Sequence, residues 1–133
     1  MLFNYLFRRK LMDVRLKREL MLKGFDYDGT LERMMDDEDL LGELIFELPE
    51  DENFDEFKNK HNSKEYKDAF SNIHAIKGVM KNLGLADTVP HLVELSDLYR
   101  AEQYEEAEPL VEIFYKEYEE ILGLINKYRE ITQ

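Results

Sequence analysis

Helix breakers are rare in this chain, and their scarcity constrains the fold more than any other feature. Three Pro and six Gly are spread over 133 residues, and β-branched residues are sparse. Such a sequence offers few places where a helix must stop and little that favours strands. Apolar residues also recur three and four positions apart, as they do along one face of a helix. The sequence therefore predicts an all-α protein.

Start and stop signals divide the chain into helices joined by short loops. Lys23-Gly24 is expected to end the first helix, because Gly often follows the last helical turn. The helices that follow are expected at about residues 31–35, 36–48, 53–62, 64–83, 87–101 and 104–129. Their expected N-terminal caps include Asp28 or Thr30, Asp36-Asp37, Ser63 and Asp87. Short loops between long helices favour antiparallel neighbours and hence an up-down bundle.

The three prolines are expected near helix ends. Pro49 is expected to stop the helix at 36–48. Pro90 and Pro109 fall in the first turns of their helices, where proline is tolerated. Pro109 is the weakest point, because its missing N–H can shift the start of the last helix to Ala107 or bend it.

Length and composition exclude several classes of function. A chain of 133 residues has room for one ordinary domain. It contains no Cys, which excludes thiol catalysis, disulfide scaffolds, iron–sulfur clusters and thiolate zinc sites. No apolar run approaches the ~20 residues of a membrane-spanning helix, and no secretory signal is recognisable. A net charge of −12 disfavours nucleic acid as a partner. We therefore expect a cytoplasmic monomer without a membrane span.

The charge is divided unequally along the chain. Residues 1–24 contain seven basic and two acidic residues, a net charge of +5, and the remaining 109 residues carry −17. Apolar residues of this first segment recur at helical spacing, at Phe3, Phe7, Leu11 and Val14. We expect a basic amphipathic N-terminal helix at residues 1–24 and a helical bundle domain at residues 25–133. The N-terminal helix is expected to pack against the bundle; a membrane surface or a partner protein is the alternative.

The helix expected at residues 64–83 has an apolar face and a face with reactive and cationic groups. At 100° per residue, one arc of about 140° collects seven apolar residues: Tyr66, Ala69, Phe70, Ile73, Ile76, Met80 and Leu83. His74 lies beyond the edge of this arc, about 120° from its centre. The residues on the same side as His74 are Lys67, Lys77, Gly78 and Lys81.

These residue types favour the transfer of a phosphoryl group to His74. A neutral imidazole has a nucleophilic nitrogen, and lysine ammonium groups attract phosphate oxygens. A Gly in the middle of a helix lowers helix stability by about 1 kcal/mol relative to Ala. Keeping Gly78 beside a nucleophile therefore suggests that another molecule approaches closely there. Two alternatives stay open. The lysines could be ordinary solvated charge, and Gly78 could allow a neighbouring helix of the same chain to cross closely at this point.

The segment HAIKGVMKNLG, from His74 to Gly84, resembles the H-x-x-K-G-x-x-x-x-x-G signature of histidine-containing phosphotransfer domains. The spacing agrees at all four signature positions, and the resemblance extends from about Phe25 to the C-terminus. Two positions depart from common usage in the family. Ile73 stands where a small residue often precedes the histidine, and Lys81 stands where a small or polar residue is frequent.

The resemblance implies an antiparallel four-helix bundle, here with an additional N-terminal helix. It also implies a phosphocarrier of a two-component phosphorelay, without kinase activity of its own. The implied partners are response-regulator receiver domains, whose aspartates exchange the phosphoryl group, and a sensor histidine kinase. The chain would need no cofactor, because in the family the metal ion lies on the receiver. No Gly-rich nucleotide-binding loop is present.

The resemblance also assigns roles to individual residues. His74 would be the phosphoryl acceptor, through Nε2. Lys77 would help to neutralise the transferred group, and Gly78 would leave room for the loops of the receiver. Lys81 would strengthen docking or restrict which receivers fit, with Lys67 on the same surface, and Gly84 would only end the helix.

Other functions receive less support from the sequence. The main alternative is a non-catalytic helical adaptor that binds a signalling partner, for which His74 would be replaceable. A metal site is disfavoured because the chain has no Glu-x-x-His pair and no H-E-x-x-H, although His91 and Glu94 stand one turn apart. An enzyme with its own substrate is disfavoured because no set of nucleophile, base and orienting group is visible.

Overall fold

The computed structural model describes residues 12–132, and within this range the protein is all-α, as predicted. The helices are α2 (Val14–Leu22), α3 (Tyr27–Arg33), α4 (Glu38–Glu47), α5 (Asn53–Asn62), α6 (Tyr66–Asn82), α7 (Leu92–Arg100) and α8 (Tyr104–Thr132), with short 3₁₀ helices η1 (Leu48–Glu50) and η2 (Ala86–Thr88). Phe3, Phe7 and Leu11 of the expected N-terminal stripe lie outside the described residues. Between residues 12 and 132, no helix is both long and apolar enough to cross a membrane.

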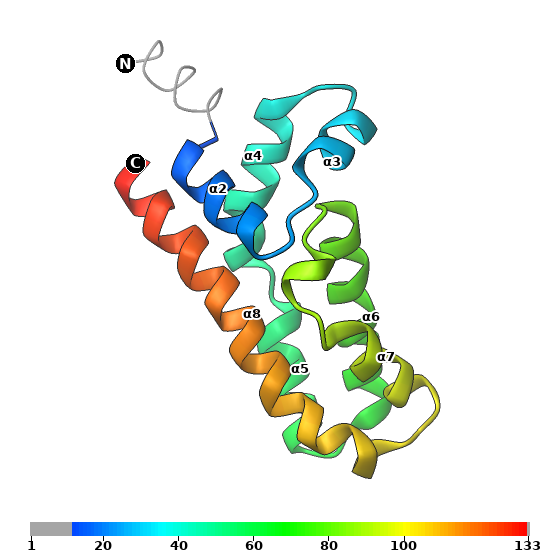
Figure 1. The fold of residues 1–133 in the computed structure, drawn as a ribbon. Coiled ribbons are helices and arrows are strands. Elements are labelled where there is room, and N and C mark those ends of the chain that lie inside the picture. The colour runs from blue at the N-terminus through cyan, green and yellow to red at the C-terminus, as the bar shows by residue number, and fades with distance from the viewer. Residues whose placement is uncertain (1–11, 133) are drawn as a thin grey trace.

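The long helix α8 extends along the molecule and packs against helices from both ends of the chain (Figure 1). Consecutive helices contact one another in the order α5, α6, α7 and α8, while α2 and α4 pack against α8. Pro109 lies inside α8, which begins at Tyr104 as expected and needs no later start. The shared core contains fully buried side chains from each of these helices, among them Leu16, Ile45, Phe57, Ile73, Leu95, Phe114 and Ile121.

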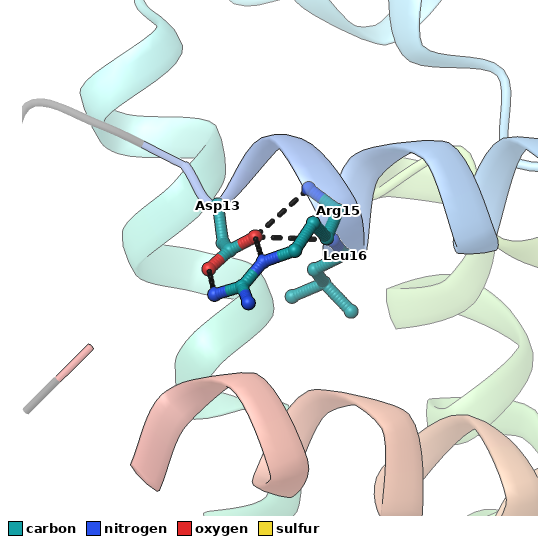
Figure 2. A network of polar contacts seen from close by, with 3 residues as sticks. All are labelled: Asp13, Arg15 and Leu16. Carbon is teal, nitrogen blue, oxygen red and sulfur yellow. Dashed lines mark hydrogen bonds and ion pairs between the residues drawn. The ribbon is translucent and has the colours of Figure 1, made fainter. Parts of the chain in front are cut away.

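Asp13 caps the first turn of α2 (Figure 2). Its Oδ1 accepts hydrogen bonds from the backbone N–H groups of Arg15 at 2.8 Å and Leu16 at 3.4 Å. The Arg15 guanidinium donates to both carboxylate oxygens, at 3.2 Å and 2.9 Å. The cap satisfies two N–H groups that no helical carbonyl reaches. Hydrogen bonding from Arg15 holds the pKa of Asp13 below its ordinary value.

The face of α2 that is buried differs from the face that the apolar pattern predicts. Leu16 and Leu20 are buried, and the helix packs against α8, which is the intramolecular packing that we expected. Val14, expected on the same apolar stripe, is instead 66% exposed. On a helix that begins at Val14, this residue lies about 140° from the midpoint of Leu16 and Leu20. Val14 therefore faces away from the core.

Five helices within the described range end in the same type of turn. In each, the second residue after the helix has a positive φ: Gly24, Met35, Lys64, Gly84 and Glu102. The next N–H donates to a carbonyl five residues earlier, the Schellman arrangement, as from Leu85 to Met80 at 2.8 Å. After α3, Asp36 has a positive φ as well. The helix stops expected at Gly24 and Gly84 are confirmed. Three further stops use residues other than Gly.

Gly84 does more than end α6. Its carbonyl accepts a hydrogen bond from the Asp26 N–H at 2.9 Å. A Cβ at this position would lie 2.0 Å from Thr30 Oγ1 and 2.8 Å from the Asp26 carbonyl oxygen. Since φ is also +73°, only Gly fits here. The expectation that Gly84 merely stops the helix is therefore too narrow, because this residue also lets the start of α3 pack against the end of α6.

The predicted cap of α3 is wrong by two to four residues. Asp26 caps the helix, accepting from the Gly29 N–H at 3.0 Å, so Asp28 falls in the first turn and Thr30 is buried within the helix. The cap of α4 is confirmed at Asp37, whose side chain accepts from the Leu40 N–H at 3.0 Å.

The cap predicted at Ser63 is also wrong. Ser63 ends α5 instead, and Lys64 follows it with a φ of 59°. The Glu65 N–H then bonds the Lys60 carbonyl at 2.8 Å, closing the turn. Because residues 63–65 form this turn, α6 begins at Tyr66.

The start of α7 lies later than predicted. Asp87 belongs to η2, and Pro90 precedes the helix, which begins at Leu92 after His91. No side chain of this segment caps α7. Glu117 from α8 accepts a hydrogen bond from the His91 N–H at 3.2 Å. The N-terminus of α7 is therefore stabilised across the interface with α8.

Candidate functional site

The predicted apolar face of α6 is buried, and this burial sets the rotation of the helix. Contacts with α5 and with α7 hold α6 in place. The residues of the predicted stripe that are almost completely buried are Ala69, Ile73, Ile76, Met80 and Leu83. Tyr66 and Phe70 are partly buried against the same core. The side that carries His74 must therefore face outward.

His74 is exposed, as predicted. Its ring lies 5.9 Å from the ring of Phe70, measured between centroids. Within residues 12–132, no hydrogen bond or ion pair engages the His74 side chain, so neither ring nitrogen is committed to a neighbour. An imidazole in this state can offer a nitrogen lone pair to a reagent from solution.

The lysines of α6 surround His74 with uncompensated positive charge. Lys67 and Lys81 are exposed, and Lys77 is half-buried. Although acidic residues outnumber basic ones by 12, none of these three lysines forms an ion pair in the part of the chain that the structure describes. Their charge therefore remains available to an approaching anion.

Gly78 lies one turn after His74 and is exposed. A Cβ built at this position meets no atom within 4 Å. The alternative of a helix crossing at Gly78 is therefore wrong, because no neighbouring helix among the described residues approaches it. Packing within the chain gives no reason for a residue that weakens the helix at this point.

The other two histidines are engaged in structural contacts. His61 is 5% exposed; its Nδ1 contacts the Tyr99 hydroxyl, and its Nε2 lies 3.0 Å from Glu108 Oε2. Burial raises the pKa of Tyr99, so its hydroxyl keeps its proton and can donate to Nδ1. His91 is half-buried and places Nδ1 2.5 Å from Glu117 Oε2. The three histidines thus differ in surroundings, and His74 is the exposed one.

Sequence reasoning missed an arginine beside the lysine face. The Arg33 guanidinium, from α3, donates to Thr30 Oγ1 at 3.1 Å and to the Lys81 carbonyl at 3.5 Å. A surface hollow of about 340 Å³ is lined by Asp26, Arg33, Lys81, Gly84, Ala86 and Asp87. Residues 33 and 81 are 48 positions apart, so no local pattern signals that they meet.

A second hollow lies beside the C-terminal half of α6. It is lined by Leu44, Glu47, Leu48, Glu50, Asp51, Val79, Asn82 and Leu83. Among the described residues, no group of three or more His, Cys, Asp or Glu side chains is placed to hold a metal ion.

The structure brings the predicted site residues onto one helix and one side of it. His74, Lys67, Lys77, Gly78 and Lys81 all belong to α6, and all lie off its buried face. Comparisons of the chain with protein-family models, with curated proteins and with solved structures found no match.

Proposed function

We propose that this protein is a histidine phosphotransfer protein of a two-component phosphorelay. In this proposal, His74 accepts a phosphoryl group from the aspartate of a receiver domain, or from a sensor histidine kinase, and donates it to another receiver. The observation that carries the proposal is the surroundings of His74. On one side of α6, an exposed imidazole and three lysines that have no ion pair within residues 12–132 lie together with an open glycine.

The proposal extends to the architecture. We infer that four segments form an antiparallel four-helix bundle: α4 together with α5, then α6, α7 and α8. Helix α2 adds an N-terminal helix to this bundle. The successive contacts of α5, α6, α7 and α8 support this description, as do the three-residue turns between α5 and α6 and between α7 and α8 (Figure 1). In such a bundle, α6 carries His74 on a rigid element whose rotation is set by core packing.

The chemistry requires few groups from this chain. The lone pair of Nε2 attacks phosphorus, an N–P bond forms, and the P–O bond to the receiver aspartate breaks. The aspartate leaves as a carboxylate, and Nδ1 carries the remaining imidazole proton, which can pass to solvent. Lys77, Lys67 and Lys81 would lower the cost of gathering negative charge around the transferred group. The reverse sequence returns the phosphoryl group to a receiver.

Gly78 has a role in docking under this proposal. Transfer needs phosphorus close to and in line with Nε2, so the surface of the receiver must approach α6 closely. A residue without a side chain one turn from His74 allows this approach. The open space at Gly78 supports the idea that a separate molecule, and not another helix of this chain, occupies it.

The test is phosphoryl transfer from radiolabelled receiver domains of the same organism. We expect an acid-labile, alkali-stable label on the wild type and none on His74→Gln. His91→Gln is the matched control, because His91 is also partly accessible but engages Glu117. It should be labelled like the wild type.

Two results would contradict the proposal. Label on His74→Gln would place the acceptor elsewhere. Failure of the folded wild type to take label from any receiver or kinase would favour the non-catalytic adaptor.

A further inference from the structure

Helix α2 turns a mixed apolar and basic face to solvent. Val14, Met21 and Leu22 are 66%, 43% and 82% exposed, on the side away from the buried Leu16 and Leu20. A shallow hollow of about 360 Å³ lies on this face and is lined by Val14, Lys17, Arg18, Met21 and Leu22. Large apolar side chains that are exposed together in this way often mark a binding surface.

The four basic residues at positions 15–23 fall into two groups. Arg15 pairs with the cap of α2, and Lys23 pairs with a carboxylate on α8. Lys17 and Arg18 form no ion pair within residues 12–132, and Lys17 rests over the ring of Tyr27, 3.8 Å from its centroid. Of the four basic residues described between positions 12 and 24, the two that border the exposed apolar side chains are therefore the ones without an ion pair to the described part of the chain.

The sequence before α2 continues the same character. Residues 1–11 contain three basic residues, no acidic residue and six large apolar or aromatic residues after Met1 (Leu2, Phe3, Tyr5, Leu6, Phe7 and Leu11). The segment 1–24 has a net charge of +5, against −17 for the rest of the chain. The partner that complements this segment combines negative charge with an apolar interior.

An anionic membrane surface has this combination. Apolar side chains can enter the boundary of the acyl chains while lysine and arginine remain among the headgroups. The acidic body does not prevent such binding, because salt screens charges beyond about 8 Å at physiological ionic strength.

We propose that this protein binds the surface of membranes that contain anionic phospholipids, through the exposed apolar and basic face of α2. In this proposal the binding is peripheral, since α2 lies at the boundary between the headgroups and the acyl chains and does not cross the membrane. It does not depend on phosphotransfer at His74, which belongs to a different helix.

The test is sedimentation of the full chain with vesicles. We expect binding to vesicles of phosphatidylcholine mixed with phosphatidylglycerol, weak binding to pure phosphatidylcholine, and loss of binding at high salt. Arg18→Gln should weaken binding about fivefold, the effect of one cation near such a surface. Leu22→Ser should weaken it by a similar factor or more, because an exposed apolar contact is lost.

Matched controls are available at exposed positions elsewhere. Val93 is 44% exposed on α7, and Lys116 is exposed on α8, so Val93→Ser and Lys116→Gln remove the same kinds of group from other surfaces. Both should bind like the wild type.

Four results would overturn the proposal: no binding to either vesicle, equal binding to both, unchanged binding of Arg18→Gln and Leu22→Ser, or a concentration-dependent dimer that these two variants dissociate. The last result would assign the face to a second copy of the chain, whose acidic body also complements it.

Discussion

At the scale of single residues, the three histidines show how surroundings separate structural from reactive roles. His61 is buried between an aromatic cluster and Glu108, and His91 is held by Glu117 at the start of α7. Modification of either would disrupt contacts that hold helices together. His74 makes no such contact among the described residues and can change its chemical state without disturbing the core.

Gly78→Ala is expected to change stability and transfer in opposite directions. The new Cβ meets no atom within 4 Å, so replacing a mid-helix Gly should raise the free energy of unfolding by about 1 kcal/mol. The same methyl group should slow phosphoryl transfer from a receiver, because it stands where the receiver docks. Urea unfolding and the initial rate of label transfer measure the two effects.

Gly123→Ala is the matched control for this prediction. Gly123 is exposed within α8, and a Cβ there also meets no atom within 4 Å. This variant should gain similar stability and transfer at the wild-type rate. If Gly78→Ala also transferred at the wild-type rate, Gly78 would have no role in docking.

Asp13→Ala should lower the free energy of unfolding by about 1 kcal/mol at pH 7, through loss of the α2 cap. In the folded protein the pKa of Asp13 is lowered, so the ionised cap stabilises the fold above the unfolded-state value near 3.9. This contribution is lost as the pH falls through the lower, folded-state pKa. The difference between wild type and variant should therefore shrink at the acidic end of a series of urea unfolding curves.

Asp28→Ala is the corresponding control. Asp28 lies in the first turn of α3 but does not cap it, so its loss should cost at most about 0.5 kcal/mol. A pH-independent difference between wild type and Asp13→Ala would show that the Asp13 carboxylate charge does not stabilise α2.

At the scale of helices, the ends were harder to predict than the helices themselves. The stops at Gly24 and Gly84 were predictable, because Gly adopts a positive φ readily. The helix end expected at residue 62 also matches α5, and the one expected at about residue 101 lies within one residue of the end of α7. The positive φ angles of Met35, Lys64 and Glu102 were not predictable, since these residues adopt that conformation only where the surrounding structure imposes it. The errors at Ser63 and at Asp87 have the same origin: the turns before α6 and α7 are set by neighbouring segments and not by the capping residue.

Glu102→Gly should raise the free energy of unfolding by about 0.5–1 kcal/mol. Glu102 has a Cβ and a φ of 59°, and this left-handed conformation costs free energy that Gly does not lose. We expect this gain to exceed the larger conformational entropy that Gly loses on folding. Gly84→Ala should do the reverse and cost more than about 2 kcal/mol, because its Cβ would collide with Thr30 and with the Asp26 carbonyl. Urea unfolding of both variants checks the pair. A destabilised Glu102→Gly or a neutral Gly84→Ala would contradict this account of the turns.

At the scale of the whole molecule, the buried face of α6 was predictable from its helical period, and with it the exposure of His74. Contacts between distant segments were not predictable. Asn72 is buried and donates to Asn53 and to Glu56, at 3.1 Å and 2.9 Å, although its own neighbours in sequence give no sign of this. The positions of Arg33 beside Lys81 and of Glu117 at the start of α7 likewise depend on how helices pack.

The proposed phosphorylation of His74 can be observed directly by NMR spectroscopy of the histidine ring nitrogens in the wild-type chain. The chain has three histidines in three different surroundings, so their ring signals can be followed separately. When a phosphorylated receiver is added, we expect nitrogen–phosphorus coupling at His74 Nε2, with the rings of His61 and His91 unchanged. Coupling at His61 or His91, or no coupling at any ring while the receiver stays phosphorylated, would contradict this expectation.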